Sequence, residues 1–159
     1  MPRVMPLVVQ TDPIAQMMWL GTSPPRVTPT VTLDAKDVPE MVKLARLTNP
    51  GPFGQRTHEL GKYIGIRQDG VLVAMAGERL HLDRYTEISA VCTLPEHRGR
   101  GYASALVSQL VHEISARKEI PFLHVRADNS EAIRVYERLG FVIRRELYVS
   151  VVSRASARP

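Results

Sequence analysis

Residues 91–114 constrain the fold most strongly, because an apolar strand pattern, a glycine-rich loop and an amphipathic helix follow one another there without a spacer. Gly99 and Gly101 lie in the loop that follows the apolar run ending at Leu94. Downstream, apolar residues recur at i, i+3, i+4, i+7, i+8 and i+11, which is the stripe of a helix that packs on one face. These residues are Ala103, Leu106, Val107, Leu110, Val111 and Ile114. The segment therefore predicts a strand–loop–helix unit with glycines at the junction.

The other periodicities predict a mixed sheet. In chain order they indicate a strand at 31–33, a helix capped by Asp34 that runs to about 47, strands at 63–68, 71–78, 85–93 and 122–126, a helix ending at Gly140, and a strand or strand pair at 141–152. Asp69-Gly70 between two apolar runs predicts an antiparallel hairpin. Strands that alternate with helices later in the chain favour parallel pairing there. The expected class is α/β.

Six of the 12 prolines fall in the first 30 residues, so this stretch differs from the rest. We expect two short strands or extended pieces at 4–9 and 14–20, followed by a linker at 21–29. The predicted organisation is an N-terminal extended segment with a Pro-rich linker at 1–30, one domain at 31–153, and a flexible tail at 154–159.

Composition excludes several classes. The chain has 159 residues, 44% of them hydrophobic and 23% charged, which fits one globular domain. Cys92 is the single cysteine, so an internal disulfide framework and a multi-cysteine zinc site are excluded. No apolar run approaches the ~20 residues of a membrane span, and the run at 5–9 is too short for a signal peptide. We expect a soluble, cytoplasmic protein without a membrane partner.

The net charge of +5 does not by itself predict nucleic-acid binding. The arginines are scattered, and no run of five or six like charges exists. A nucleic-acid binder also requires a stacking platform or a basic stripe, and the sequence shows neither. We therefore expect no nucleic-acid partner.

The loop at 98–103 is suited to binding an anion. Its glycines let successive N–H groups point into one concavity at the positive end of a helix, which suits a pyrophosphate. The loop lacks the Gly-Lys-Ser/Thr of a phosphate-binding P-loop and the G-x-G-x-x-G spacing of dinucleotide folds. The alternative is a tight strand–helix turn with surface arginines.

Two motifs together resemble the GNAT superfamily of acyl-CoA-dependent N-acyltransferases. Arg98-Gly99-Arg100-Gly101-Tyr102-Ala103 matches the family pattern Q/R-x-x-G-x-G/A. Residues 129–141 match N-x-x-A-x-x-x-Y-x-x-x-G-F at every fixed position. The stretch from residues 51–54 through residues 86–89 looks like the glycine-N-acyltransferase-like branch. The resemblance implies a three-layer fold, with a mixed, mostly antiparallel sheet of about six or seven strands and helices on both faces.

The resemblance also implies how the co-substrate, acetyl-CoA or another acyl-CoA, is held, with no metal involved. Backbone groups of Val91, Cys92 and Thr93 would pair with the pantetheine arm, and Asn129 would reach the same arm. The loop residues would hold the pyrophosphate: Arg98, Gly99, Arg100, Gly101, Tyr102 and Ala103. Family members commonly have two strands after the last helix, so we expect residues 4–9 or 14–20 to complete the sheet, in cis or from a partner chain.

Tyr136 and Glu87 are the expected catalytic residues. The resemblance places Tyr136 near the thioester sulfur, where a phenol that stays protonated at neutral pH can donate to the leaving thiolate. Tyr136 also lies on an apolar stripe, so a purely structural role is the alternative. Glu87 is the best candidate base, with a pKa that burial would raise; a solvated or salt-bridged residue is the alternative. Water, His58 or Glu59 could replace it.

The remaining candidates are assigned structural roles. His97, His112 and His124 are expected to be surface or structural residues, and Cys92 to be a packing residue rather than a nucleophile. The expected function is transfer of an acetyl group from acetyl-CoA to a primary amine, by direct attack in a ternary complex. The acceptor is a small amine, an amino acid or a protein amine. The alternative is a non-catalytic CoA-binding regulatory module. A homodimer is left open.

Overall fold

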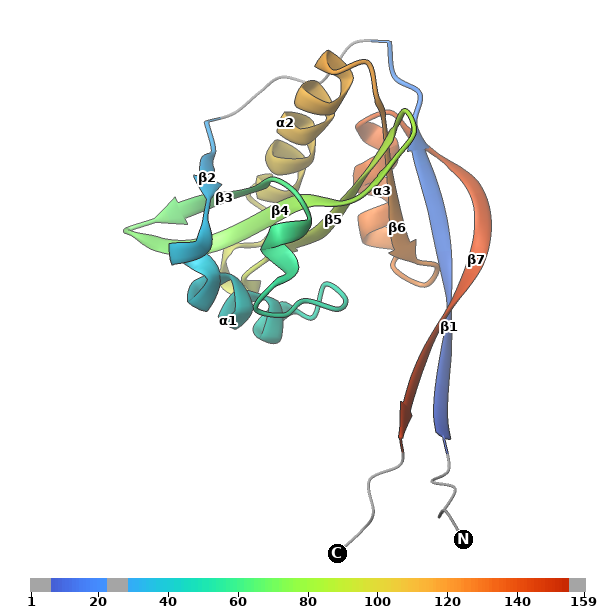
Figure 1. The fold of residues 1–159 in the computed structure, drawn as a ribbon. Coiled ribbons are helices and arrows are strands. Elements are labelled where there is room, and N and C mark those ends of the chain that lie inside the picture. Colours follow the sequence, from blue (N-terminus) through green and yellow to red (C-terminus); the bar gives the residue numbers. More distant parts are fainter. Residues whose placement is uncertain (1–6, 23–28, 155–159) are drawn as a thin grey trace, which may run out of the picture.

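A computed structural model of the chain describes residues 7–22 and 29–154. The expectations for residues 4–6, for most of the linker at 21–29 and for the tail after 154 therefore lie outside the described residues. The elements, shown in Figure 1, are β1 (Leu7–Trp19), β2 (Val31–Leu33), α1 (Val38–Thr48), β3 (Tyr63–Gln68), β4 (Val71–Leu82), β5 (Tyr85–Thr93), α2 (Tyr102–Ala116), β6 (Ile120–Arg126), α3 (Ser130–Arg138) and β7 (Phe141–Arg154).

The seven strands form one sheet in the order β2-β3-β4-β5-β6-β1-β7. All neighbours are antiparallel except β5 and β6, which are parallel. This confirms the predicted class, a mixed and mostly antiparallel sheet in an α/β fold.

Helices cover both faces of the sheet. Ala74 and Ala76 of β4 pack in one buried cluster with residues of α2, such as Leu106, and with Tyr136 of α3. Met75 of β4 lies in a second cluster with Met41 of α1. Because successive side chains of a strand point to opposite faces, α1 lies on one face and α2 and α3 on the other. The result is three layers.

Local signals explain where the helices begin and end. Asp34 is a cap, as predicted, and forms a capping box with Asp37, but it caps a short 3-10 turn at Ala35–Asp37, and α1 begins only at Val38. Asn49 ends α1 in a left-handed conformation. The Asn129 side chain accepts from the backbone N–H of Ala132 at 3.1 Å and so caps α3.

The two short strands expected near the N-terminus were wrong, because β1 is one continuous strand that runs through Pro13. The backbone oxygen of Pro13 accepts from the N–H of Ala127 at 3.0 Å, on the β6 side. The N–H and C=O of one strand residue point to the same side, so the position of the missing Pro13 N–H also faces β6. This position lies just beyond Ile14, where the pairing of β1 with β6 ends. The ladder to β7 is not interrupted.

β1 lies between β6 and β7, so the described part of the N-terminal segment completes the sheet within the same chain. Ala15 and Met17 enter the buried cluster under α2. The indole N–H of Trp19 donates to the backbone oxygen of Leu139 at 2.9 Å, which ties the end of β1 to the turn before β7.

Residues 7–13 and 148–154 form a two-stranded extension of the sheet, which we name the β1–β7 arm. β7 pairs with β1 along its whole length, whereas β6 pairs only with residues 14–18 of β1. The arm consequently projects beyond the other strands (Figure 1). None of the helices in the described ranges is long and apolar enough to cross a membrane.

β5 and β6 separate partway along their length. Their parallel pairing ends at Ile88 and Leu123, although β5 continues to Thr93 and β6 to Arg126. Ala90 takes a left-handed conformation with φ of 54°, and the β4–β5 register shifts in this region. The edge of β5 that faces β6 is therefore not paired with that strand after residue 88.

Candidate active site

A cleft of about 610 Å³ opens where β5 and β6 separate. Its walls come from the end of β5, the loop that leads into α2, the last turn of α1 and one face of α3. It takes in nearly every residue that the resemblance assigned to the co-substrate: Val91, Cys92, Thr93, Arg98, Gly99, Gly101, Tyr102, Ala103 and Asn129. Residues separated along the sequence by the whole of α2 and β6 are thus brought to one site.

The loop forms an open cradle at the start of α2. Gly99 and Gly101 have φ of 74° and 79°, and a Cβ atom on either would meet nothing within 4 Å. Gly101 is the N-cap of α2 and no side chain caps this end, so its first N–H groups lack a side-chain acceptor. Such an end suits an anion.

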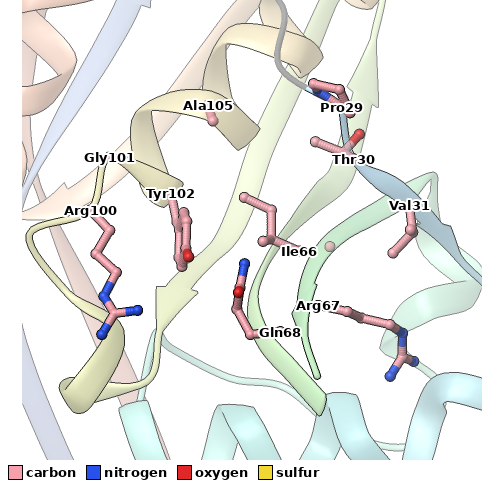
Figure 2. A pocket seen from close by; sticks show the side chains of 11 residues that line it. Pro29, Thr30, Val31, Ile66, Arg67, Gln68, Arg100, Gly101, Tyr102 and Ala105 are labelled. Atoms are coloured by element: carbon pink, nitrogen blue, oxygen red, sulfur yellow. The ribbon is translucent and has the colours of Figure 1, made fainter. Parts of the chain in front are cut away.

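Arg100 is the one predicted loop residue that does not line the cleft. Its side chain borders a second hollow of about 420 Å³, between the start of α2 and the strands β2 and β3. Figure 2 shows Arg100 beside Tyr102, with Ile66 and Gln68 across the hollow. Only the backbone of Arg100 thus remains a candidate contact for a ligand in the cleft.

Tyr136 projects from α3 into the buried side of the cleft. It is 8% exposed, and its ring packs edge-on against Phe141 at a centroid distance of 6.0 Å. Burial, and to a lesser extent the nearby Cys92 thiol, raises the pKa of Tyr136 to about 12. The phenol consequently remains a proton donor throughout the neutral range.

Cys92 is buried among apolar residues, as expected for a packing residue. Burial raises the pKa of its thiol to about 11. Since the thiolate is the nucleophile, a raised pKa works against a covalent role.

Glu87 does not line the cleft, and it is 1% exposed. Arg79 donates to both of its carboxylate oxygens, at 2.7 and 2.8 Å, and His124 Nδ1 lies 2.8 Å from Oε1. Burial favours the neutral acid, but the hydrogen bonds from His124 and Arg79 outweigh it and lower the pKa of Glu87. The raised pKa expected from the sequence was therefore wrong, and the salt-bridged alternative describes the residue.

His124, expected to be a surface or structural residue, lies within hydrogen-bond distance of Glu87. Its side chain is 19% exposed and links Glu87 to Gln16, whose Nε2 lies 3.0 Å from His124 Nε2. The alternation of β6 carried a usable signal, because His124 shares a face with the buried Phe122.

The alternative bases lie elsewhere. Glu59 is tied to Arg56 in an exposed 3-10 turn, and His58 Nδ1 lies 3.0 Å from the backbone oxygen of Gln55. Neither lines the cleft. Within the described ranges, no three His, Cys, Asp or Glu side chains gather closely enough to hold a metal ion.

Glu87→Gln is expected to lower the free energy of unfolding by about 3 kcal/mol at pH 7, because it leaves the Arg79 guanidinium without its carboxylate. The folded-state pKa of Glu87 is lowered, so its contribution is present above the unfolded value of about 4.3 and is lost as pH falls through the folded value. Urea unfolding at pH 7, 5 and 3 should show the difference between variant and wild type shrinking with acidity.

Glu59→Gln is the matched control, since its carboxylate also meets an arginine but is exposed. It should change stability little at any of the three pH values. A Glu87→Gln protein as stable as wild type at pH 7 would contradict a stabilising Arg79–Glu87 pair.

Comparisons with known proteins relate the chain to a family model and to acetyltransferases. Residues 63–150 match the family model described as FR47-like protein. The chain is 28% identical over 135 residues to the [ribosomal protein bS18]-alanine N-acetyltransferase of Escherichia coli, covering 79% of this chain and 90% of that protein. It is 39% identical over 77 residues to a mycothiol acetyltransferase of Streptomyces griseus, but this match covers 46% of the chain and only 25% of that protein.

A solved structure supports the same relation. A putative acetyltransferase from the GNAT family of Novosphingobium aromaticivorans superposes with a TM-score of 0.88 at 41% identity, covering 94% of this chain and 68% of that one. The structure of the E. coli ribosomal-protein-S18-alanine N-acetyltransferase superposes with a TM-score of 0.64 at 21% identity, and so shares the fold.

Proposed function

The chain belongs to the FR47-like family of GNAT acetyltransferases, and on this premise we propose that it transfers an acetyl group from acetyl-CoA to a primary amine by direct attack in a ternary complex. One observation carries the proposal: the free edge of β5, the glycine cradle of α2 and the buried phenol of Tyr136 all meet in one cleft. We also propose that the chain falls in the glycine-N-acyltransferase-like branch, which the stretch from residues 51–54 through residues 86–89 resembles.

The walls of the cleft fit the two ends of acetyl-CoA. Val91, Cys92 and Thr93 lie beyond the last β5–β6 pair, so their backbone is available to an extended pantetheine arm in the manner of an added strand. The loop from Gly99 to Ala103 offers backbone N–H groups to the pyrophosphate. Acetyl-CoA supplies the activated thioester, and the chain supplies the binding groups and the proton transfers.

We assign proton donation on the thiol side to Tyr136. Its hydroxyl is protonated at neutral pH and is held on the cleft side of α3 by packing against Phe141. On the amine side, we assign a role to the network around Glu87, which lies on β5 just before the strands separate.

The proposed acceptor is a small amine, an amino acid or a protein amine. Among relatives, one is named for an alanine of a ribosomal protein and another for mycothiol. Arg79, which could have bound an acceptor carboxylate, is already occupied by Glu87. The acceptor is therefore identified by experiment.

Thiol release from acetyl-CoA, measured against a panel of amino acids, polyamines, aminoglycosides and short peptides, tests the proposal. Release with one acceptor class supports an acetyltransferase and names its substrate. Acetyl-CoA that raises the melting temperature without any release would instead support the non-catalytic CoA-binding module. If acetyl-CoA gives no thiol release and does not stabilise the protein, both the acetyltransferase and the CoA-binding module are overturned.

We propose in addition that the β1–β7 arm holds two copies of the chain together. β7 is the edge strand of the sheet, and Tyr148 and Val152 on the arm are 75% and 56% exposed. An unpaired edge with apolar side chains is a template for pairing with a second strand, and an equivalent β7 satisfies both sides at once.

Val152→Asp is expected to convert a dimer into a monomer in light-scattering measurements, because it places a charge in the proposed contact. Val71→Asp is the matched control, since Val71 is similarly exposed at 54% but lies at the start of β4. A wild-type protein that is monomeric at high concentration would contradict the proposal.

A further inference from the structure

Every carboxylate and imidazole of the chain can be placed relative to the cleft. All 16 Asp and Glu residues and all five His residues fall within residues 7–22 and 29–154. Among them, only His97 and Glu131 line the cleft. A side chain that takes a proton from the acceptor amine must therefore be one of these two, or must lie directly behind the wall of the cleft.

The two carboxylate and imidazole residues that line the cleft lie away from the Tyr136 hydroxyl. His97 ends a 3-10 turn at Pro95–His97 and directly precedes the loop of the glycine cradle, so it belongs to the pyrophosphate end. Glu131 is exposed in the first turn of α3, five residues before Tyr136. Five residues turn a helix by about 140° beyond one full turn, so the two side chains point in different directions.

Glu87 lies behind the wall of the cleft, and both of its oxygens are already engaged. Oε1 accepts from Arg79 Nη2 at 2.7 Å and lies 2.8 Å from His124 Nδ1, and Oε2 accepts from Arg79 Nε at 2.8 Å. The residue is 1% exposed, and although burial favours the neutral acid, the hydrogen bonds lower its pKa. A carboxylate that is buried and held in this way is a poor acceptor for a proton from the cleft.

His124 is engaged at both ring nitrogens. Arg144 donates to Gln16 Oε1 at 2.8 Å, so the amide nitrogen of Gln16 faces His124 Nε2 at 3.0 Å as a donor. Nδ1 then carries the proton directed at Glu87, and the one lone pair of the ring, on Nε2, accepts from Gln16. The network around Glu87 thus connects the strands where β5 and β6 separate, and this positioning is the role we assign to it on the amine side.

The titratable groups on the buried side of the cleft hold their protons. Burial raises the pKa of the Cys92 thiol to about 11, and burial together with that nearby thiol raises the pKa of Tyr136 to about 12. Near neutral pH both groups are proton donors and not bases. A protonated amine that entered the cleft would therefore meet donors, and no residue of the described ranges is placed there to deprotonate it.

We propose that the acceptor reacts as an amine that is already neutral in solution, and that it is the N-terminal α-amine of a peptide or protein. This inference rests on the proposed function and names its substrate class. At pH 7, about 14% of a peptide α-amine with a pKa of about 7.8 is neutral, against about 0.04% of a lysine amine with a pKa of about 10.4. A free amino acid is less suited, because its own carboxylate favours the charged amine. Arg79, which could bind that carboxylate, is held by Glu87.

Atoms and protons balance in this transfer without a side-chain base. The lone pair of the neutral amine forms the C–N bond with the thioester carbonyl carbon. As the C–S bond breaks, the Tyr136 hydroxyl donates its proton to the departing thiolate. The proton lost by the amine nitrogen passes to water and the tyrosinate takes one from water, so that amine and thioester give amide and thiol.

Two forms of one short peptide test the substrate class. One form has a free α-amine and an acetylated lysine, and the other has an acetylated α-amine and a free lysine. At pH 7 we expect kcat/KM for thiol release from acetyl-CoA to favour the first form at least about tenfold, because the neutral fractions differ about 300-fold and the more basic amine, as the better nucleophile, recovers part of this. The preference should fall about tenfold between pH 7 and pH 9, where the lysine amine still gains neutral form and the α-amine is nearly all neutral.

The pH profile separates this explanation from a simple fit of the cleft to peptides. The acid limb of kcat/KM should lie at the pKa of whichever acceptor is used, near about 7.8 for the peptide and higher for its N-terminal amino acid in free form. A base of the protein would add a limb at one pH for both acceptors. Glu131→Gln and His97→Asn should leave the acid limb in place, whatever they do to KM for acetyl-CoA.

The outcomes separate the acceptor class from the proposed function. Equal use of the two peptide forms at pH 7, or an acid limb that stays at one pH for both acceptors, overturns the neutral α-amine and leaves the transferase intact. No thiol release with any acceptor, despite stabilisation by acetyl-CoA, overturns the proposed function and the acceptor class with it. A preference for the free α-amine, with a limb that follows the acceptor, supports both.

Discussion

Tyr136→Phe is expected to reduce kcat for acetyl transfer about 1,000-fold while KM for acetyl-CoA stays within about twofold. The substitution removes only the hydroxyl, so the packing of the ring against Phe141 persists. With the pKa of Tyr136 raised to about 12, the phenol is fully protonated at the pH of the assay. Its loss leaves the departing thiolate without a donor, which affects the chemical step and not binding.

Tyr148→Phe supplies the control, because it removes the same hydroxyl from the exposed arm. Steady-state rates for both variants, with the best acceptor of the panel, give the comparison. A Tyr136→Phe enzyme with wild-type kcat would remove this tyrosine from the reaction. A selective rise in KM for acetyl-CoA would make it a binding residue instead.

Gly101→Val is expected to raise KM for acetyl-CoA about 100- to 1,000-fold. Valine at φ of 79° is strained, so the loop must leave the conformation that aims its N–H groups into the cleft. A hydrogen bond to a charged group contributes about 1.5–3 kcal/mol, so losing two such bonds to a pyrophosphate accounts for an effect of this size.

Gly70→Val is a close control for the strain itself. Gly70 has φ of 81° and, like Gly101, would have nothing within 4 Å of an added Cβ atom, but it lies in the β3–β4 hairpin. Both variants should lose stability to a similar extent in thermal unfolding, whereas only Gly101→Val should lose affinity for acetyl-CoA. An equal loss of affinity in both would show that strain, not the cradle, is responsible.

The elements with strong local signals were predictable from the sequence. The Asp69-Gly70 turn fixed the β3–β4 hairpin, and the apolar stripe from Ala103 to Ile114 fixed α2. The prediction divided the N-terminal strand in two, because a proline such as Pro13 usually interrupts a strand. Only the register shows that its missing N–H faces a side on which β6 no longer pairs.

The two parts of the candidate site, the acetyl-CoA residues and the network around Glu87, also differ in how far the sequence predicts them. The residues proposed for acetyl-CoA are mostly contiguous along the end of β5 and the loop to α2, so a motif reveals them. The network of Arg79, Glu87, His124 and Gln16 comes from four strands. The sequence could suggest that Glu87 is buried, but its lowered pKa depends on partners 8 and 37 residues away.

The place of β1 in the sheet has a consequence for how the chain reaches its folded state. Both neighbours of β1 follow it by more than 100 residues, and Leu7 finally lies opposite Arg154. During synthesis this strand is made before the other six strands of the sheet and lacks its two neighbours until β6 and then β7 emerge, with Met17 and Ala15 not yet covered. Contacts of such high sequence separation close late and slowly. The interval before they close is therefore when a nascent chain is most open to aggregation and depends most on chaperones.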